Sequence, residues 1–246
     1  MDRIMEEATE ILNYLPNRFK NQVEQEYIEF LWDSFKSNYE NEKYQFSFMA
    51  YHMLFMSFVY FNVWQIKKIH QADYDKITLG FNDCFSTATS PFTYSKENER
   101  RIFLLFTFFG LRKEQIGKYK KIVDQRNEVA HSNGNIYFKA QETVDEKIIE
   151  ILKFAEEIQE KTKSAIQDGF EKFLIESQDE EERRYIDIQE QINEELIHEH
   201  YMSLKDIEFC LDYDITQLSV QPNYAEIEKI FEELKTEYAQ EEEANA

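Results

Sequence analysis

One short segment of the sequence combines residue types that can cleave RNA without a metal or another cofactor. Arg126 and His131 are separated by four residues, and Asn127 directly follows the arginine. RNA breaks when its 2′-hydroxyl attacks the adjacent phosphate, a reaction that needs proton transfer and positive charge. Histidine exchanges protons near neutral pH, and arginine binds phosphate oxygens through two parallel hydrogen bonds. The segment therefore predicts a catalytic site in which His131 transfers protons, Arg126 stabilises charge and Asn127 orients backbone or substrate.

A regular helix does not place these two side chains on one face. Positions five apart lie about 140° apart around a helix axis. Two alternatives stay open: the helix unwinds near His131, or each side chain completes a site with a second copy of the chain. Each residue also has a purely structural interpretation. Arg126 can pair with Glu128 or Asp124, and a charged His131 would be favourable at a helix C-terminus.

This segment resembles the signature of the HEPN superfamily, in which an arginine, often followed by asparagine, precedes a histidine by four to six residues. The resemblance implies a HEPN-like helical bundle over residues 1–175 and leaves residues 176–246 uncovered. It further implies a metal-independent endoribonuclease of a toxin or phage-defence system. Such an enzyme leaves 2′,3′-cyclic phosphate and 5′-hydroxyl ends and acts as a homodimer in which two motifs face each other. An antitoxin or a defence-system protein is a further expected partner.

A basic segment lies immediately upstream of the histidine. Residues 96–126 carry nine lysines and arginines against four acidic residues. Because nucleic-acid affinity rests on clustered cations, we expect this segment to bind RNA phosphates, although a solvated helix face has the same composition. The expected RNA-binding residues are Arg112, Lys113, Lys120 and Lys121.

The net charge of −21 lies entirely in the C-terminal part of the chain. Residues 1–140 hold 18 acidic and 18 basic residues, whereas residues 141–246 hold 31 and 10. Residues 176–246 are therefore expected to form an acidic helical appendage, whose carboxylates could cover the basic segment and restrain a nuclease. The alternative function is a non-catalytic assembly module that binds a basic partner through this appendage. A DNA-mimicking inhibitor is a weaker idea, because the first 140 residues are neutral.

Composition and periodicity predict an all-α fold. Only 5 glycines and 3 prolines occur in 246 residues, too few for the turns of a β-sandwich or for a glycine-rich phosphate loop. Apolar residues recur at helical spacing. They predict a helix over 112–131, another over 95–109 and a polar helix over about 181–200. They also predict a long helix from 144 to about 175, either continuous or broken at Gly169. Residues 214–220 are expected to form a short extended piece.

The remaining signals favour a soluble cytoplasmic protein. Residues 44–66 contain no charged side chain and could span a bilayer by length, but their many polar and aromatic residues favour a buried central helix. The first residues lack the apolar run of a secretion signal, and two cysteines cannot build a disulfide framework. His198 and His200 lie two apart, on different sides of a helix, so no metal site is expected. His52 is expected to be a core histidine.

Overall fold

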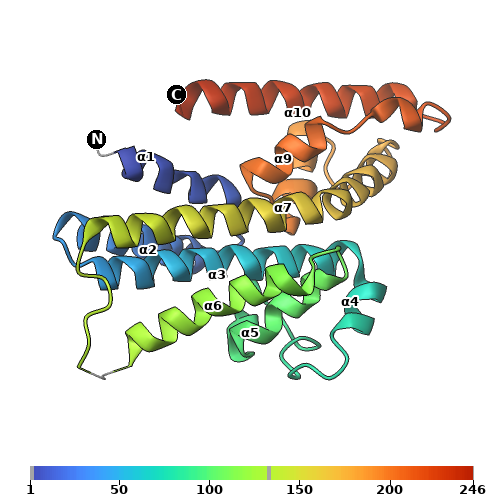
Figure 1. Ribbon diagram of the computed structural model, residues 1–246. Helices are drawn as coiled ribbons and strands as arrows, with labels where there is room; N and C mark the ends of the chain where they lie inside the picture. Colours follow the sequence, from blue (N-terminus) through green and yellow to red (C-terminus); the bar gives the residue numbers. More distant parts are fainter. Residues whose placement is uncertain (1–2, 132–133, 246) are drawn as a thin grey trace.

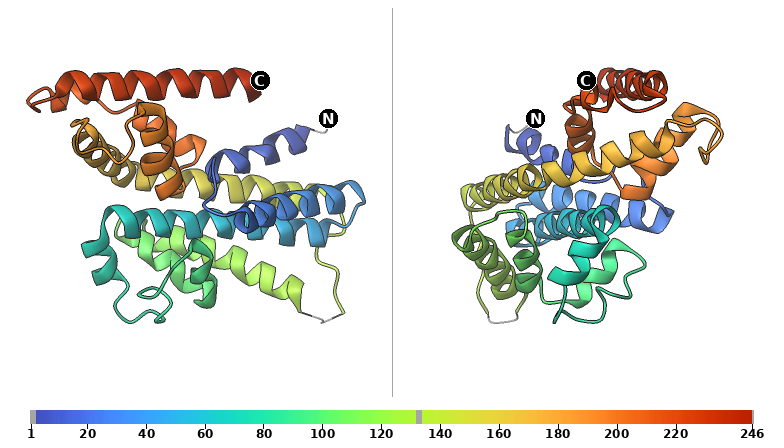
Figure 2. Two further views of the ribbon diagram at one scale, coloured as in Figure 1. Left: turned by 180° about the vertical axis from the view of Figure 1, so that it is seen from behind. Right: turned by 90° about the vertical axis from the view of Figure 1, so that its right-hand side faces the viewer.

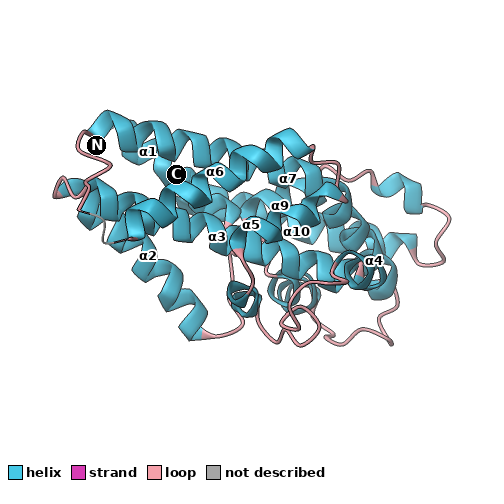
Figure 3. Cartoon of the chain, turned by 60° about the horizontal axis from the view of Figure 1, so that its bottom comes forward, coloured by secondary structure: helices cyan, strands magenta, loops and turns pink. Residues whose placement is uncertain are grey.

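The computed structural model describes residues 3–131 and 134–245, which fold into a bundle of helices (Figure 1). All regular secondary structure in these ranges is helical (Figure 3), and the one isolated β-bridge joins Pro16 and Ser203. The all-α class is therefore confirmed. The α-helices are α1 (Arg3–Thr9), α2 (Gln22–Glu40), α3 (Tyr44–Ile69), α4 (Gln71–Ile77), α5 (Glu99–Ile102), α6 (Lys113–Ala130), α7 (Gln141–Ser177), α8 (Ile188–Gln191), α9 (Leu204–Leu211) and α10 (Tyr224–Asn245). Shorter elements are the 3-10 helices η1 (Glu10–Tyr14), η2 (Pro91–Lys96), η3 (Phe103–Thr107) and η5 (Ile215–Leu218), and the π-helix η4 (Ile192–His198).

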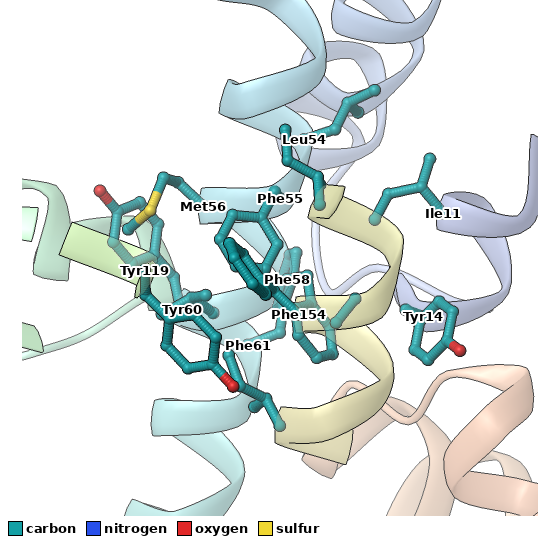
Figure 4. Close-up of a cluster of buried hydrophobic side chains, with 14 of the residues drawn as sticks. Ile11, Tyr14, Leu54, Phe55, Met56, Phe58, Tyr60, Phe61, Tyr119 and Phe154 are labelled. Atoms are coloured by element: carbon teal, nitrogen blue, oxygen red, sulfur yellow. The ribbon is translucent and has the colours of Figure 1, made fainter. Parts of the chain in front are cut away.

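Helix α3 is the centre of the bundle. It packs against α2, α6 and α7, and nearly all of its side chains from Ser47 to Ile66 are buried. Its aromatic rings pack against side chains of neighbouring helices in the core drawn in Figure 4. The ring centroids of Phe55 and of Phe154 on α7 are 6.5 Å apart. Within the described ranges α3 is the one helix long and apolar enough to cross a membrane, and 83% of its most apolar window is buried. This burial is that of the core helix of a soluble protein, as the polar residues in the segment predicted.

Helix α7 is the longest element and runs without interruption through Gly169. Of the two expected alternatives, the continuous helix is therefore confirmed. Gly169 is needed for close packing: a Cβ atom at this position would lie 2.7 Å from Cδ1 of Ile69 at the end of α3. The glycine lets the two long helices approach each other where any larger residue would collide.

The buried apolar residues form two clusters that meet along α7. The first cluster contains α3 and the first part of α7 to Ile158, and the second begins at Ile166 and contains α9 and α10. Figures 1 and 2 show α10 on one side of α7 and α3, and α6 on the opposite side. In a single chain the acidic α10 therefore does not reach the basic segment on α6, so the expected restraint by this helix is not built into the fold.

Several elements differ locally from the sequence expectations. The helix expected over 95–109 is divided into α5 and the 3-10 helix η3. The helix expected over 181–200 begins only at Ile188 and widens into a π-helix. Residues 215–218 form a 3-10 turn instead of an extended piece. The 3-10 helix η3 and the π-helix η4 differ from an α-helix in hydrogen-bond spacing, which side-chain periodicity encodes weakly.

Candidate functional site

Helix α6 carries the arginine and the histidine, and its two ends agree with the expected helix to within one residue. Its buried side holds Tyr119, Ile122 and Val123. At 100° per residue, Arg126 points to the same side as these residues, toward α3 and α5. The arginine is therefore a charged residue on a core-facing stripe.

Arg126 forms an ion pair with Glu99, the first residue of α5. The same carboxylate oxygen, Oε2, lies 3.3 Å from Nε2 of His52 on α3. His52 is fully buried, whereas the side chains of Glu99 and Arg126 are 20% and 24% exposed. We call these three residues the charged cluster; it joins α3, α5 and α6 at a point where the core reaches the surface.

The surroundings of Glu99 and His52 lower the pKa of both groups. Burial alone would raise the pKa of Glu99, but hydrogen bonds and charges from His52 and Arg126 outweigh it, and the pKa lies below its ordinary value. Burial lowers the pKa of His52, against an opposing effect of Glu99. An ionised carboxylate only accepts hydrogen bonds, so neutral His52 carries its proton on Nε2. Nδ1 of His52 and Nε of Arg126 are buried without a hydrogen-bond partner in the described part of the chain.

His131 lies outside this cluster. It follows the last residue of α6 with extended backbone angles (φ −84°, ψ 136°), and its N–H donates to the carbonyl of Asn127 at 3.2 Å. Its side chain is exposed, and Asn127 is half-buried. The helix stays regular up to Ala130 and ends there, so the chain leaves the helix at His131, which is one of the two expected alternatives. Ser132 and Asn133, expected to help end the helix, lie outside the described residues.

The expected RNA-binding residues lie on the solvent side of α6 and at its start. Arg112, Lys113 and Lys121 are exposed and Lys120 is half-exposed. None of these four has an acidic partner within salt-bridge distance in the ranges 3–131 and 134–245. Other cations of the basic segment are engaged: Arg100 pairs with Asp124 at 3.2 Å. The four residues thus remain available to an external anion.

Exposed apolar side chains lie on α3 near the C-terminal end of α6. Phe46 and Met53 are 57% and 38% exposed. Gln45 is next to Phe46, and its Nε2 donates to the carbonyl of Val129 at 3.4 Å. Its Oε1 accepts a hydrogen bond from the N–H of Tyr137 at 3.0 Å. An apolar surface therefore adjoins the helix end that carries His131.

Two members of the charged cluster, His52 and Glu99, could not be recognised as partners from the sequence. His52 was expected in the core, which is confirmed by its complete burial, but its partner Glu99 was not foreseen. The usable signal is indirect: a histidine deep in an uncharged helix needs a polar partner from elsewhere in the chain. Many acidic residues could have filled that role.

The other histidines do not form a metal site. Nδ1 of His198 contacts Glu194, and its Nε2 lies 2.8 Å from the carbonyl of Phe19, whereas Nδ1 of His200 faces the carbonyl of Leu196. The described residues contain no group of three or more metal-ligating side chains of His, Cys, Asp or Glu.

Comparison with known proteins leaves the site to be interpreted from its own chemistry. The chain matches no family model, no curated protein and no solved structure.

Proposed function

We propose that this protein is a metal-independent endoribonuclease of the HEPN type. The observation that carries the proposal is the state of Arg126: Glu99 holds its guanidinium in place, yet 24% of the side chain is exposed. Arginine has five N–H donors, so a guanidinium can bind a carboxylate on one side and a phosphate on the other. This is the arrangement that a fixed phosphate-binding charge requires.

In the proposed reaction the 2′-oxygen bonds to phosphorus while His131 takes its proton. The bond from phosphorus to the 5′-oxygen breaks, and this oxygen receives a proton from the resulting imidazolium or from water. Arg126 neutralises the charge that develops on the phosphate, and Asn127 supports the helix end through its carbonyl bond to His131. The products are a 2′,3′-cyclic phosphate and a 5′-hydroxyl, and no cofactor takes part.

The proposed active unit is a homodimer. Arg126 faces inward and His131 faces solvent, so one chain does not direct both at the same phosphodiester. The exposed Phe46 and Met53 beside the end of α6 are apolar surface that a second copy would cover. Two copies related by a twofold axis through this surface would bring Arg126 of one chain toward His131 of the other.

The proposed biological role is that of a cytoplasmic toxin or phage-defence effector. An RNA-cleaving enzyme harms its own host and needs restraint. Helix α10 lies on the far side of the bundle from α6 (Figure 1), so in this proposal restraint comes from a separate partner protein such as an antitoxin.

The test is cleavage of labelled RNA by the full chain in the presence of EDTA, with chemical analysis of both new ends. We expect cleavage, and we expect its loss in His131→Ala and in Arg126→Ala. His70→Ala is the matched control, because His70 is half-exposed and pairs with Asp168 at 3.2 Å away from α6. Mixing the two inactive variants should restore part of the activity if each site is shared between chains. Absence of cleavage by the unmodified protein would contradict the proposal.

The second candidate function is a non-catalytic assembly module. It is favoured by a different interpretation of the same contact, in which Arg126 serves only to neutralise Glu99 where the core reaches the surface. The acidic C-terminal region would then bind a basic partner. Retention of RNA binding or partner binding in a protein that never cleaves RNA would support this function.

A further inference from the structure

A cavity of about 240 Å³ lies where the ends of α3 and α7 meet the segment 182–200. Its apolar wall contains Ile69 of α3 and Phe173 of α7. Pockets for drug-sized ligands measure roughly 300–1,000 Å³, so this cavity suits a smaller molecule. It is remote from the proposed catalytic residues, because the end of α6 that carries His131 lies beside Gln45 at the opposite end of α3.

The charges around the cavity are balanced. Four basic and four acidic side chains line it. Several of them already form ion pairs: Lys68 pairs with Glu199 at 2.5 Å. Arg184 likewise pairs with Glu195 at 2.8 Å. A ligand with one sign of charge would disturb this balance, whereas a zwitterion preserves it. The polar groups that remain without a partner therefore indicate what the cavity binds.

Arg183 provides a buried guanidinium in a fixed orientation. Its side chain is 1% exposed. Nε donates to the carbonyl of Ser177 at 2.6 Å, and Nη2 donates to Oε2 of Glu226 at 2.7 Å. Nη1 has no partner in the described part of the chain, yet it is not sealed off from open space. Arginine N–H groups bind carboxylates strongly, so Nη1 is a preorganised donor for an anionic group.

The hydroxyl of Ser177 is a second donor at the same wall of the cavity. Its Oγ accepts a hydrogen bond from Nε2 of Gln191 at 3.0 Å. The hydroxyl proton itself has no acceptor among the described residues, although the side chain is buried. Because Nε of Arg183 binds the carbonyl of Ser177, the two free donors belong to residues in direct contact. Together they suit the two oxygen atoms of a carboxylate.

The cavity also contains hydrogen-bond acceptors. Glu182 precedes Arg183, and its exposed carboxylate has no ion pair within the ranges 3–131 and 134–245. Burial lowers the pKa of His200, so its ring is neutral at pH 7. Nδ1 of His200 lies 3.1 Å from the carbonyl of Leu196 and carries the proton that it donates there. Nε2 is then an acceptor. An ammonium group has three N–H donors and suits this pair of acceptors.

The backbone beside the cavity departs from regular helix. Glu195 belongs to the π-helix η4. Tyr201, which directly follows His200, has a left-handed φ of 54°. Both features cost free energy and are frequent at functional sites. They are independent of the side-chain charges and support a binding role for this part of the molecule.

We infer that the cavity binds a small zwitterion, namely a free α-amino acid with an apolar side chain. The carboxylate binds Arg183, the ammonium group binds Glu182 and His200, and the side chain contacts Ile69 and Phe173. Glu182 and Arg183 are adjacent in the chain and line one cavity, which matches a ligand that carries both charges on one carbon atom. The inference goes beyond the proposed nuclease and does not depend on it.

The first experiment measures binding to the full chain by thermal unfolding and by calorimetric titration. L-valine, L-leucine, L-methionine and L-phenylalanine are screened. A ligand at about 100 times its Kd should raise Tm by roughly 5–10 °C. The tightest binder is then compared with the carboxylic acid that lacks its ammonium group and with the amine that lacks its carboxylate. Each analogue should bind about 10- to 100-fold more weakly, because one charged hydrogen-bonding group is missing.

Variants assign the two ends of the ligand. Glu182→Gln should weaken amino-acid binding about tenfold or more and leave the affinity for the carboxylic acid unchanged. Glu181→Gln is the matched control, since Glu181 is adjacent, exposed and outside the cavity lining. Arg183→Lys should weaken binding of both the amino acid and the carboxylic acid. Ser177→Ala should have the same effect and provides the test if Arg183→Lys does not fold.

Three results would overturn the inference. The first is that none of the amino acids raises Tm. The second is equal affinity of Glu182→Gln and Glu181→Gln for the amino acid. The third is binding of the carboxylic acid as tight as that of the amino acid, which would make the cavity a simple anion site. Absence of RNA cleavage would contradict the proposed function alone, because His131 takes no part in this site.

Discussion

His52 and Arg126 converge on one oxygen atom of Glu99, so that a buried imidazole and a half-buried guanidinium share a single carboxylate. The arrangement ties three helices together at the edge of the core. It also restricts the guanidinium to one orientation. The stability of the bundle and the availability of Arg126 to a ligand therefore depend on the same residue, Glu99.

Replacement of Glu99 by glutamine is expected to destabilise the protein by about 1–3 kcal/mol, because it removes the charge that compensates a partly buried arginine. Urea unfolding measures the change. Asp33→Asn is the control, since Asp33 pairs with Lys36 on an exposed part of α2, and its effect should stay within about 0.5 kcal/mol. If the nuclease proposal holds, Glu99→Gln should also lower kcat about tenfold or more by loosening the guanidinium. Equal stability of the two variants would contradict the compensating role of Glu99.

The stability contributed by neutral His52 should disappear in mild acid. Burial lowers the pKa of His52 from its ordinary value of 6.5, so below that pH the unfolded chain binds a proton that the folded chain resists. The folded state therefore loses stability as pH falls through about 6.5, and His52→Gln lacks this loss. Unfolding free energies of both proteins are compared at about pH 7.5, 6.5 and 5.5. The difference in unfolding free energy between the two proteins should become smaller as the pH falls. A constant difference would show that the pKa of His52 is the same in the folded and unfolded chain.

Asp206→Ala is expected to be among the most damaging substitutions in the chain. The buried carboxylate accepts hydrogen bonds from Gln65 of α3 at 2.8 Å, from Gln159 of α7 at 2.6 Å, and from the N–H and hydroxyl of Ser203 at 2.9 Å each. Its removal leaves these donors unpaired and removes one half of the capping box of α9, which should cost about 3 kcal/mol or more. Asp212→Ala, at an exposed site, should change stability by less than about 0.5 kcal/mol. Similar thermal midpoints for the two variants would be inconsistent with this network.

Two glycines within helices should respond in opposite ways to the same substitution. Gly169→Ala places a methyl group 2.7 Å from Ile69, and overpacking of this kind costs about 1–3 kcal/mol. Gly117→Ala meets nothing within 4 Å and should stabilise α6 by up to about 1 kcal/mol through helix propensity. Calorimetry of both variants tests the pair. Ile69→Ala removes all three contacting atoms of Ile69, so Gly169→Ala should cost less in the Ile69→Ala background than in the parent. An equal cost in both backgrounds would mean that the collision is not the cause.

Long amphipathic segments could be predicted well from the sequence. The apolar spacing of α6 and α7 predicted both helices, because each buries one continuous stripe. The uncharged segment around α3 was correctly predicted as a core helix, since its polar residues are unsuited to lipid. The pitch changes at η3 and η4 were not predictable, because they depend on packing between elements.

The candidate site was predictable only in part. Residue chemistry selected Arg126 and His131 as candidates, and the structure leaves Arg126 partly buried on α6 and His131 exposed just after its end. The pairing of Arg126 with Glu99 was not predictable: Asp124 and Glu128 are nearer in sequence, and only the fold places α5 against α6. The role of His131 stays a prediction, since its exposed side chain has no interaction that distinguishes a catalyst from a surface residue.

Helix α7 belongs to both hydrophobic clusters, and this limits how the protein can be dissected. A chain cut shortly after Ser177 would keep Phe170, Phe173 and Leu174 while losing the residues of α9 and α10 that pack in the same cluster. Such a fragment would expose an apolar surface to water and would tend to aggregate. A change in the activity or binding of a shortened protein would then reflect self-association. Substitutions in the intact chain are therefore the better way to test the role of residues 176–246.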